Sequence, residues 1–184
     1  MVRALTFISL FVFCSFVSAH QKSALYQVDL IAFTHHNTGD LSSSEQTAST
    51  ALASAHAIPL KINGSKTLSP YHTLPAASSQ LRNEYWALHR KAHYQILLHY
   101  SWLQPGNNQS AILLPTVDHH GWSLSGTLRV RKSNYYLLDT DLLFSSPDQG
   151  KTFSFNQKQR LKAGEVYYLD HPQVGLLIKV HKIS

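Results

Sequence analysis

Cysteine is almost absent from this chain of 184 residues, and the single one, Cys14, stands in the apolar run near the N-terminus. The rest of the chain therefore forms no disulfide and offers no thiolate to a substrate or a metal. Acidic residues are also few: 10 aspartates and glutamates stand against 16 lysines and arginines, which gives a formal net charge of +6. This balance favours an anionic partner, such as a cell-wall polymer, lipid head groups or nucleic acid.

Residues 1–19 have the three parts of a secretory signal peptide. Arg3 supplies the early positive charge, an apolar run follows, and residues 17–19 are the small residues that precede a cleavage site. The run is too short to span a membrane, and we expect no membrane span in the remaining chain, residues 20–184. Because an exported protein rarely meets nucleic acid, we expect no nucleic-acid partner.

A period of two predicts the strands that build the core. In the segment 157–183, three extended runs are separated by turns at Gly164 and at Asp170-His171-Pro172. The last run has one wholly apolar face, which indicates a strand packed on the core. This face consists of Val174, Leu176, Ile178 and Val180. The same alternation predicts a first strand from Tyr26 to Phe33.

One helix stands out between these ends. Residues 78–91 carry Leu81, Tyr85 and Leu88 at helical spacing, with a serine available as N-cap. Further strands are predicted over 94–103 (with Ile96, Leu98, Tyr100 and Trp102 on one face), over 112–114 up to Pro115, and from Gly126 onward, with a hairpin turn at 147–150. This pattern predicts an α+β domain, a mainly antiparallel sheet with one or two helices packed on one face.

Residues 35–77 interrupt the regular pattern. They are rich in Ser, Thr, Ala, Gly and Pro, and no hydrophobic period is sustained. A weak helix is expected over 42–57, and turn signals follow over 61–75. We predict a flexible surface excursion from one domain that comprises residues 20–184, rather than a second domain.

Three blocks of the chain resemble the CsiV family. The segment 26–33, YQVDLIAF, is similar to the family's opening Y-x-V-E-[VL]-I-x-F. The segment 126–142 resembles the block G-x-[LI]-x-[LV] followed by S-R-Y-L-H-[LV]-x-x-D-L. The segment 165–178, EVYYLDHPQVGLLI, resembles the ending E-L-H-Y-[LI]-D-H-P and the apolar strand after it. Three positions depart from the pattern: Asn134 replaces an Arg, and Leu137 and Tyr167 each replace a His.

The resemblance implies a periplasmic protein of Gram-negative bacteria that associates with peptidoglycan. It implies an accessory role in cell-wall synthesis and cell-shape integrity, with no catalysis and no cofactor of its own. It also implies two protein partners, a class A penicillin-binding protein and its outer-membrane lipoprotein activator.

Cations and aromatic rings on the predicted strands are the candidate binding residues for such a polymer. Arginine makes bidentate contacts with carboxylates, and flat rings offer apolar faces on which sugar rings rest. The candidates are Arg129, Arg131, Tyr135, Arg160, Tyr167, Asp170 and His171, with Lys158, Lys162 and Trp122 as neighbours. A structural interpretation stays open for each, because strand-face charges are normally solvated and Asp-His-Pro is typical of a rigid turn. Glu165 is expected to cap its strand or to pair with Arg160.

Two other functions stay open. The 12 histidines include the pairs His35-His36 and His119-His120, and His89 and His93 stand four residues apart, a spacing that allows two imidazoles to share a zinc ion. However, no cysteine or H-E-x-x-H motif accompanies them, and we assign no metal ligand. A small wall hydrolase that uses Asp or Glu with His is the other alternative. The chain shows no complete nucleophile elbow, and we assign no catalytic residue.

Overall fold

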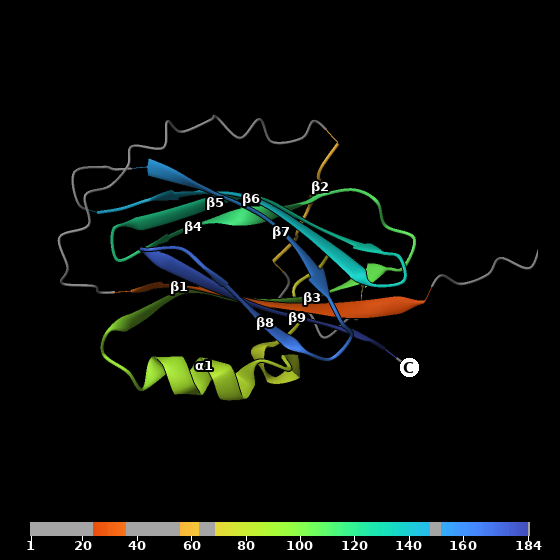
Figure 1. The fold of residues 1–184 in the computed structure, drawn as a ribbon, viewed down its shortest axis with the longest axis horizontal. Helices are drawn as coiled ribbons and strands as arrows, with labels where there is room; N and C mark the ends of the chain where they lie inside the picture. Colours follow the sequence, from red (N-terminus) through yellow and green to blue (C-terminus); the bar gives the residue numbers. More distant parts are fainter. Residues whose placement is uncertain (1–23, 36–55, 63–68, 148–151, 184) are drawn as a thin grey trace, which may run out of the picture.

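The computed structural model describes residues 24–35, 56–62, 69–147 and 152–183. In these residues, two β-sheets face each other and one α-helix lies on the outer side of the smaller sheet (Figure 1). The smaller sheet has the strand order β3-β1-β9-β8: β3 (Tyr94–Pro105), β1 (Leu25–His35), β9 (Val174–Lys182) and β8 (Val166–Asp170). The larger has the order β2-β4-β5-β6-β7: β2 (Ile58–Pro59), β4 (Ile112–His119), β5 (Trp122–Lys132), β6 (Tyr136–Ser145) and β7 (Thr152–Leu161). Neighbouring strands are antiparallel except β2 and β4, which are parallel.

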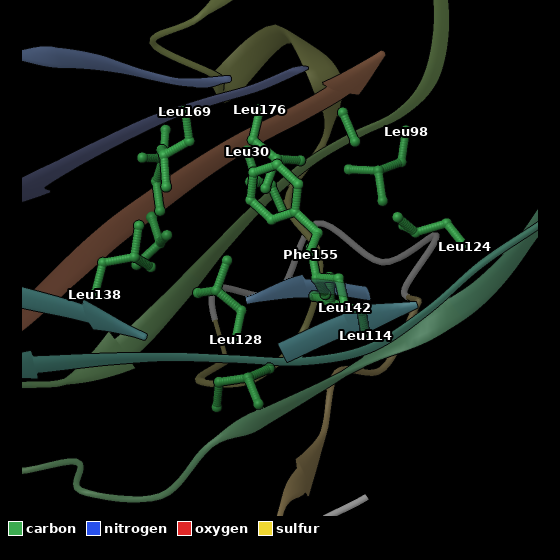
Figure 2. Close-up of a cluster of buried hydrophobic side chains, with 14 of the residues drawn as sticks. Leu30, Leu98, Leu114, Leu124, Leu128, Leu138, Leu142, Phe155, Leu169 and Leu176 are labelled. Atoms are coloured by element: carbon green, nitrogen blue, oxygen red, sulfur yellow. The ribbon is translucent and has the colours of Figure 1, made fainter. Parts of the chain in front are cut away.

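The main core fills the space between the two sheets. Figure 2 shows Leu30 and Leu176 from the four-stranded sheet meeting Leu128, Leu142 and Phe155 from the five-stranded sheet. The predicted apolar face of β9 is confirmed, because all four of its residues are at most 1% exposed. The predicted inward face of β1 is confirmed in the same way. Alternation of apolar and polar residues therefore selected the correct faces of both strands.

A second, smaller core lies on the other side of the four-stranded sheet. Ile31 and Phe33 of β1 pack there against Leu81, and Tyr85 and Leu88 of α1 (Arg82–His89) complete the contact. The three predicted inward residues of the helix are thus confirmed. The predicted serine N-cap is wrong: the N-cap is Leu81, without a side-chain hydrogen bond. A serine acts just before the helix instead, because the hydroxyl of Ser79 accepts the backbone N–H of Leu81 at 3.1 Å.

The prediction of an α+β domain is confirmed only in part. The chain is predominantly β, its single α-helix within the described residues is only 8 residues long, and the strands form two sheets rather than one. A short 3-10 helix, η1 (Ala76–Ser78), precedes it. The turn at Gly164, where φ is +77°, is confirmed, but it carries the chain from the larger sheet into the smaller one. Periodicity reports which face of a strand is buried, and it contains no information about which sheet the strand joins.

Two predicted strands, over 94–103 and 112–114, are present, but irregular pairing changes one face of the first and the end of the second. Ala32 pairs with Leu98 but Phe33 pairs with Ile96, so Leu97 is an extra residue in β3. This bulge turns Ile96 toward the helix, whereas Leu98 faces the main core. The strand predicted to stop at Pro115 instead continues to His119, with a register shift between Leu114 and Val117. A proline is tolerated in a strand at such an irregularity.

The described parts of the segment 35–77 are joined to the larger sheet and to β3. Lys61 forms a β-bridge with His72, and Thr73 forms one with Trp102. Leu60 is buried in the main core. The signal-peptide region, nearly all of the helix expected over 42–57 and most of the turn at 147–150 lie outside the described residues. Within the described residues, no helix has the length and apolar character that crossing a membrane requires.

Candidate functional site

The outward surface of β5, β6 and β7 gathers most of the predicted cations. Leu128 and Val130 of β5 point into the main core, so Arg129 and Arg131 point outward, as the alternation predicts. Cross-strand pairing sets two rows of neighbours on this surface: Arg129, Asp139 and Lys158 in one, and Arg131, Leu137 and Arg160 in the other. We call the surface formed by Arg129, Arg131, Lys158 and Arg160, together with Tyr135 at its end, the cationic face.

Asp139 fixes both arginines of β5 through a single oxygen. Its Oδ2 accepts hydrogen bonds from Arg129 Nε at 3.0 Å and from a terminal nitrogen of Arg131 at 3.2 Å. The second contact of Arg129, from a terminal nitrogen, is 2.8 Å long. Two guanidinium groups therefore share one carboxylate, and the trio keeps one excess positive charge. Arg131 Nε is buried and has no hydrogen-bond partner among the described residues, so it is not open to a surface ligand. The remaining N–H donors of both arginines suit a carboxylate or phosphate ligand.

An exposed aromatic ring ends the cationic face. Tyr135, in the turn between β5 and β6, is 48% exposed, and the guanidinium carbon of Arg160 lies 5.6 Å from its ring centroid. Beside it is a hollow of about 360 Å³ whose lining includes Lys132 and Lys162. The site thus combines a flat apolar surface with several cations.

Tyr167 joins this end of the molecule through its hydroxyl group. The hydroxyl accepts the backbone N–H of Lys162 at 2.9 Å and donates to Glu165 Oε2 at 3.0 Å. Its ring packs against the main core, so it is less open than a sugar platform requires. Glu165 pairs with Lys162 at 3.6 Å, and the expected pairing with Arg160 is wrong. The two strands around this turn enter different sheets, which directs their side chains apart.

Asp170 and His171 lie at the opposite end of β8, away from the cationic face. Asp170 Oδ1 accepts the hydroxyl of Tyr168 at 2.5 Å and lies 3.7 Å from His35 Nε2. The ring of His171 stacks on Phe153, and burial lowers the pKa of His171, with Asp170 opposing this shift and His35 adding to it. The structure therefore divides the predicted site residues between two places, and the role of this second pair in binding stays a prediction.

Trp122 is wrongly predicted as an open ring. It is only 8% exposed and packs edge-on against Phe153, with ring centroids 6.3 Å apart. Asp139 is not among the predicted site residues, although it is the fixed partner of both arginines. Alternation along its strand places Asp139 on the side opposite Leu138 and Leu142, but pairing register is needed to place it opposite Arg129.

His89 and His93, which stand four residues apart in the sequence, contact different aromatic rings. His89 stacks on Tyr85 with ring centroids 5.7 Å apart, whereas His93, beyond the end of α1, lies 4.2 Å from Tyr94. Among the described residues, no group of three or more His, Cys, Asp or Glu side chains is placed to hold a metal ion. His36 lies outside these residues.

The outward face of the five-stranded sheet combines fixed arginines, further cations and an exposed ring, a chemistry that suits an anionic polymer. The family model of the peptidoglycan-binding protein CsiV matches residues 5–183 of the chain. The chain therefore belongs to the CsiV family of peptidoglycan-binding proteins. Comparisons with curated proteins and with solved structures found no match.

Proposed function

We propose that this protein is a non-catalytic periplasmic accessory factor that holds peptidoglycan on its cationic face. The family membership supplies the polymer, and the observation that carries the placement is the sharing of one Asp139 oxygen by Arg129 and Arg131. Peptidoglycan stem peptides bear carboxylates, and guanidinium groups fixed in advance lose little entropy when they bind them. The ring of Tyr135 adds an apolar contact for a sugar or an alkyl chain.

The accessory role extends this proposal to protein partners. A binding module without catalysis acts in wall synthesis by bringing the polymer to an enzyme. We infer that the partners are a class A penicillin-binding protein and its outer-membrane lipoprotein activator, as the family resemblance implies. The edge of β8 with its exposed Val166 and Tyr168 is available for such a contact while the cationic face holds the polymer.

The test is sedimentation of the mature protein with insoluble sacculi. Arg129→Glu with Arg131→Glu, and separately Arg160→Glu with Tyr135→Ala, are expected to weaken binding by about tenfold or more, because charge reversal replaces attraction by repulsion. Lys61→Glu is the matched control, an exposed cation of the segment that follows β2, and is expected to change binding little. Equal binding by all variants would refute the cationic face. Release of soluble muropeptides by the purified protein would favour a wall hydrolase.

A further inference from the structure

A second hollow lies on the far side of the four-stranded sheet, between η1 and α1. Its volume is about 490 Å³, and its lining residues are Ala76, Ala77, Arg82, Tyr85, Trp86 and His99. We propose that this hollow, here called the Trp86 hollow, binds an N-acetylated hexosamine ring of the peptidoglycan glycan strand. The proposal rests on the proposed function, and it assigns the glycan and the peptide parts of the polymer to two different surfaces.

Aromatic rings line the hollow, and among them Trp86 is the exposed one. Trp86 is 53% exposed although it is the largest side chain of α1. Tyr85 packs edge-on against Trp86 at 5.3 Å and stacks on His99 at 5.0 Å with an interplanar angle of 21°. A pyranose ring has an apolar C–H face and polar edges, so it fits a surface of this kind better than a wholly apolar ligand does.

The remaining lining residues fit the substituents of such a sugar. The side chains of Ala76 and Ala77 are small and apolar, which leaves room for the methyl group of an N-acetyl substituent. Arg82 is exposed and forms no ion pair with another described residue. Its guanidinium N–H groups are hydrogen-bond donors, which suits the lactyl carbonyl that joins alternate sugars of the glycan strand to their stem peptides. Burial lowers the pKa of His99 more than Asp29 raises it, so this ring stays neutral and adds no second charge.

A fully buried carboxylate holds the walls of the hollow. Asp29 of β1 is 0% exposed, and its Oδ1 accepts hydrogen bonds from Ser101 Oγ at 2.5 Å and from the backbone N–H of Gln80 at 3.3 Å. Gln27 Nε2 donates both to Asp29 Oδ1 and to the carbonyl of Ser78, each at 2.8 Å. The carboxylate of Asp29 thus anchors the segment between η1 and α1 to the four-stranded sheet.

The same network fixes the aromatic floor. The hydroxyl of Ser79 lies 2.8 Å from His99 Nε2, and His99 in turn stacks on Tyr85. The other oxygen of Asp29, Oδ2, has no hydrogen-bond partner among the described residues and faces His181 Nδ1 at 3.7 Å. A buried carboxylate lowers stability unless it is well compensated, so its placement beneath an open aromatic hollow indicates a preorganised binding site.

One site on the outer face of each sheet would make the protein bivalent. When one site holds a glycan strand, the other is presented to peptides at a high effective concentration. Sacculi would then bind more tightly than either soluble fragment, and the loss of one site would leave weak binding rather than none.

The test uses two soluble probes with the mature protein: the tetramer of β-1,4-linked N-acetylglucosamine, which has no carboxylate, and a free stem peptide. The tetramer is expected to shift the fluorescence of the exposed Trp86, because the other two tryptophans, Trp102 and Trp122, are buried. Isothermal titration calorimetry, which does not depend on the Trp86 fluorescence, compares the variants: Trp86→Ala should weaken tetramer binding about tenfold, as the loss of one stacked ring implies, and leave the stem peptide unaffected. Ile62→Ala, which removes an exposed apolar side chain (67%) from the segment that follows β2, is the control.

The outcomes separate this inference from the proposed function. Arg160→Glu should weaken the stem peptide and leave the tetramer unaffected. Failure of the unmodified protein to bind the tetramer, or equal binding by Trp86→Ala, would overturn the Trp86 hollow while leaving the cationic face intact. Loss of stem-peptide and sacculus binding in Trp86→Ala, with the tetramer unaffected, would overturn it as well. If the protein binds the tetramer but charge reversal on the cationic face leaves sacculus binding unchanged, the placement of peptidoglycan on the cationic face would be overturned instead.

Discussion

The ring of His171 lies flat on the ring of Phe153, with centroids 4.5 Å apart and planes inclined by only 2°. This stack joins the turn between β8 and β9 to the five-stranded sheet. Gln157 strengthens the same joint, because its side-chain amide donates to the carbonyl of Asp170 at 2.8 Å. The Asp-His-Pro turn is therefore a structural link between the two sheets.

We expect His171→Ala to lower the free energy of unfolding by about 1 kcal/mol, the value of a stacked aromatic pair. His171→Phe should recover most of this loss, because the ring is kept. Urea denaturation followed by circular dichroism measures both variants. Unchanged stability of His171→Ala together with weaker sacculus binding would contradict the structural role and support the predicted binding role of this residue.

Gly126 and Gly164 both have positive φ, +128° and +77°, but their surroundings differ. An added Cβ at Gly126 would collide with the backbone of Asp141 and Leu142, whereas nothing lies within 4 Å at Gly164. We expect Gly164→Ala to cost about 1 kcal/mol from backbone strain alone, and Gly126→Ala to cost about 3 kcal/mol or more. Paired denaturation curves check this order. Equal costs would show that the backbone at β6 moves aside readily.

The free energy of unfolding should decrease when the pH drops below the ordinary pKa of histidine. Burial lowers the pKa of His99, His171 and His181 from 6.5, and for His181 the nearby Lys179 adds to burial while Asp29 opposes it. Their unfolded forms then bind protons at a higher pH than their folded forms. The contribution of these histidines to the free energy of unfolding is therefore complete above about pH 6.5. It decreases as the pH falls toward their lowered pKa values.

Chemical denaturation at pH 7.5 and at pH 5.5 measures this loss. His181→Gln should show a smaller difference between the two conditions, because one of the three groups no longer titrates. A stability that is constant across this range, or one that rises on acidification, would contradict the burial of these imidazoles.

The sequence predicted the faces of the strands better than their partners. Val174 and Leu176 could be placed in the core because alternation is a local property. The two-sheet arrangement could not, because the tight turn at Gly164 looks the same whether its strands pair or separate. The bulge at Leu97 also left no local signal.

The same limit applies to the candidate sites: the face of a residue could be predicted, but its contacts could not. Arg129 and Arg131 were predictable as outward residues, whereas their common contact with Asp139 depends on register across two strands. The Trp86 hollow could not be predicted, because helical spacing identifies the residues on the buried side of α1 and not a hollow on its exposed side. Its floor also depends on His99, which comes from a different element, and only the folded chain brings the two rings together.

Asp139 orders the two arginines and neutralises one of their charges, so we expect it to limit the affinity of the cationic face. Asp139→Asn removes the carboxylate that neutralises one of the two charges, so we expect sacculus binding to strengthen by up to about fivefold at low salt. The gain should disappear as the salt concentration rises, because exposed charges are screened. Asp141→Asn is the matched control: it makes the same change of charge on the outward side of β6, at a residue that forms no ion pair with another described residue. An equal gain in both variants would show that only net charge matters, and weaker binding by Asp139→Asn would show that holding the arginines in place matters more than freeing them.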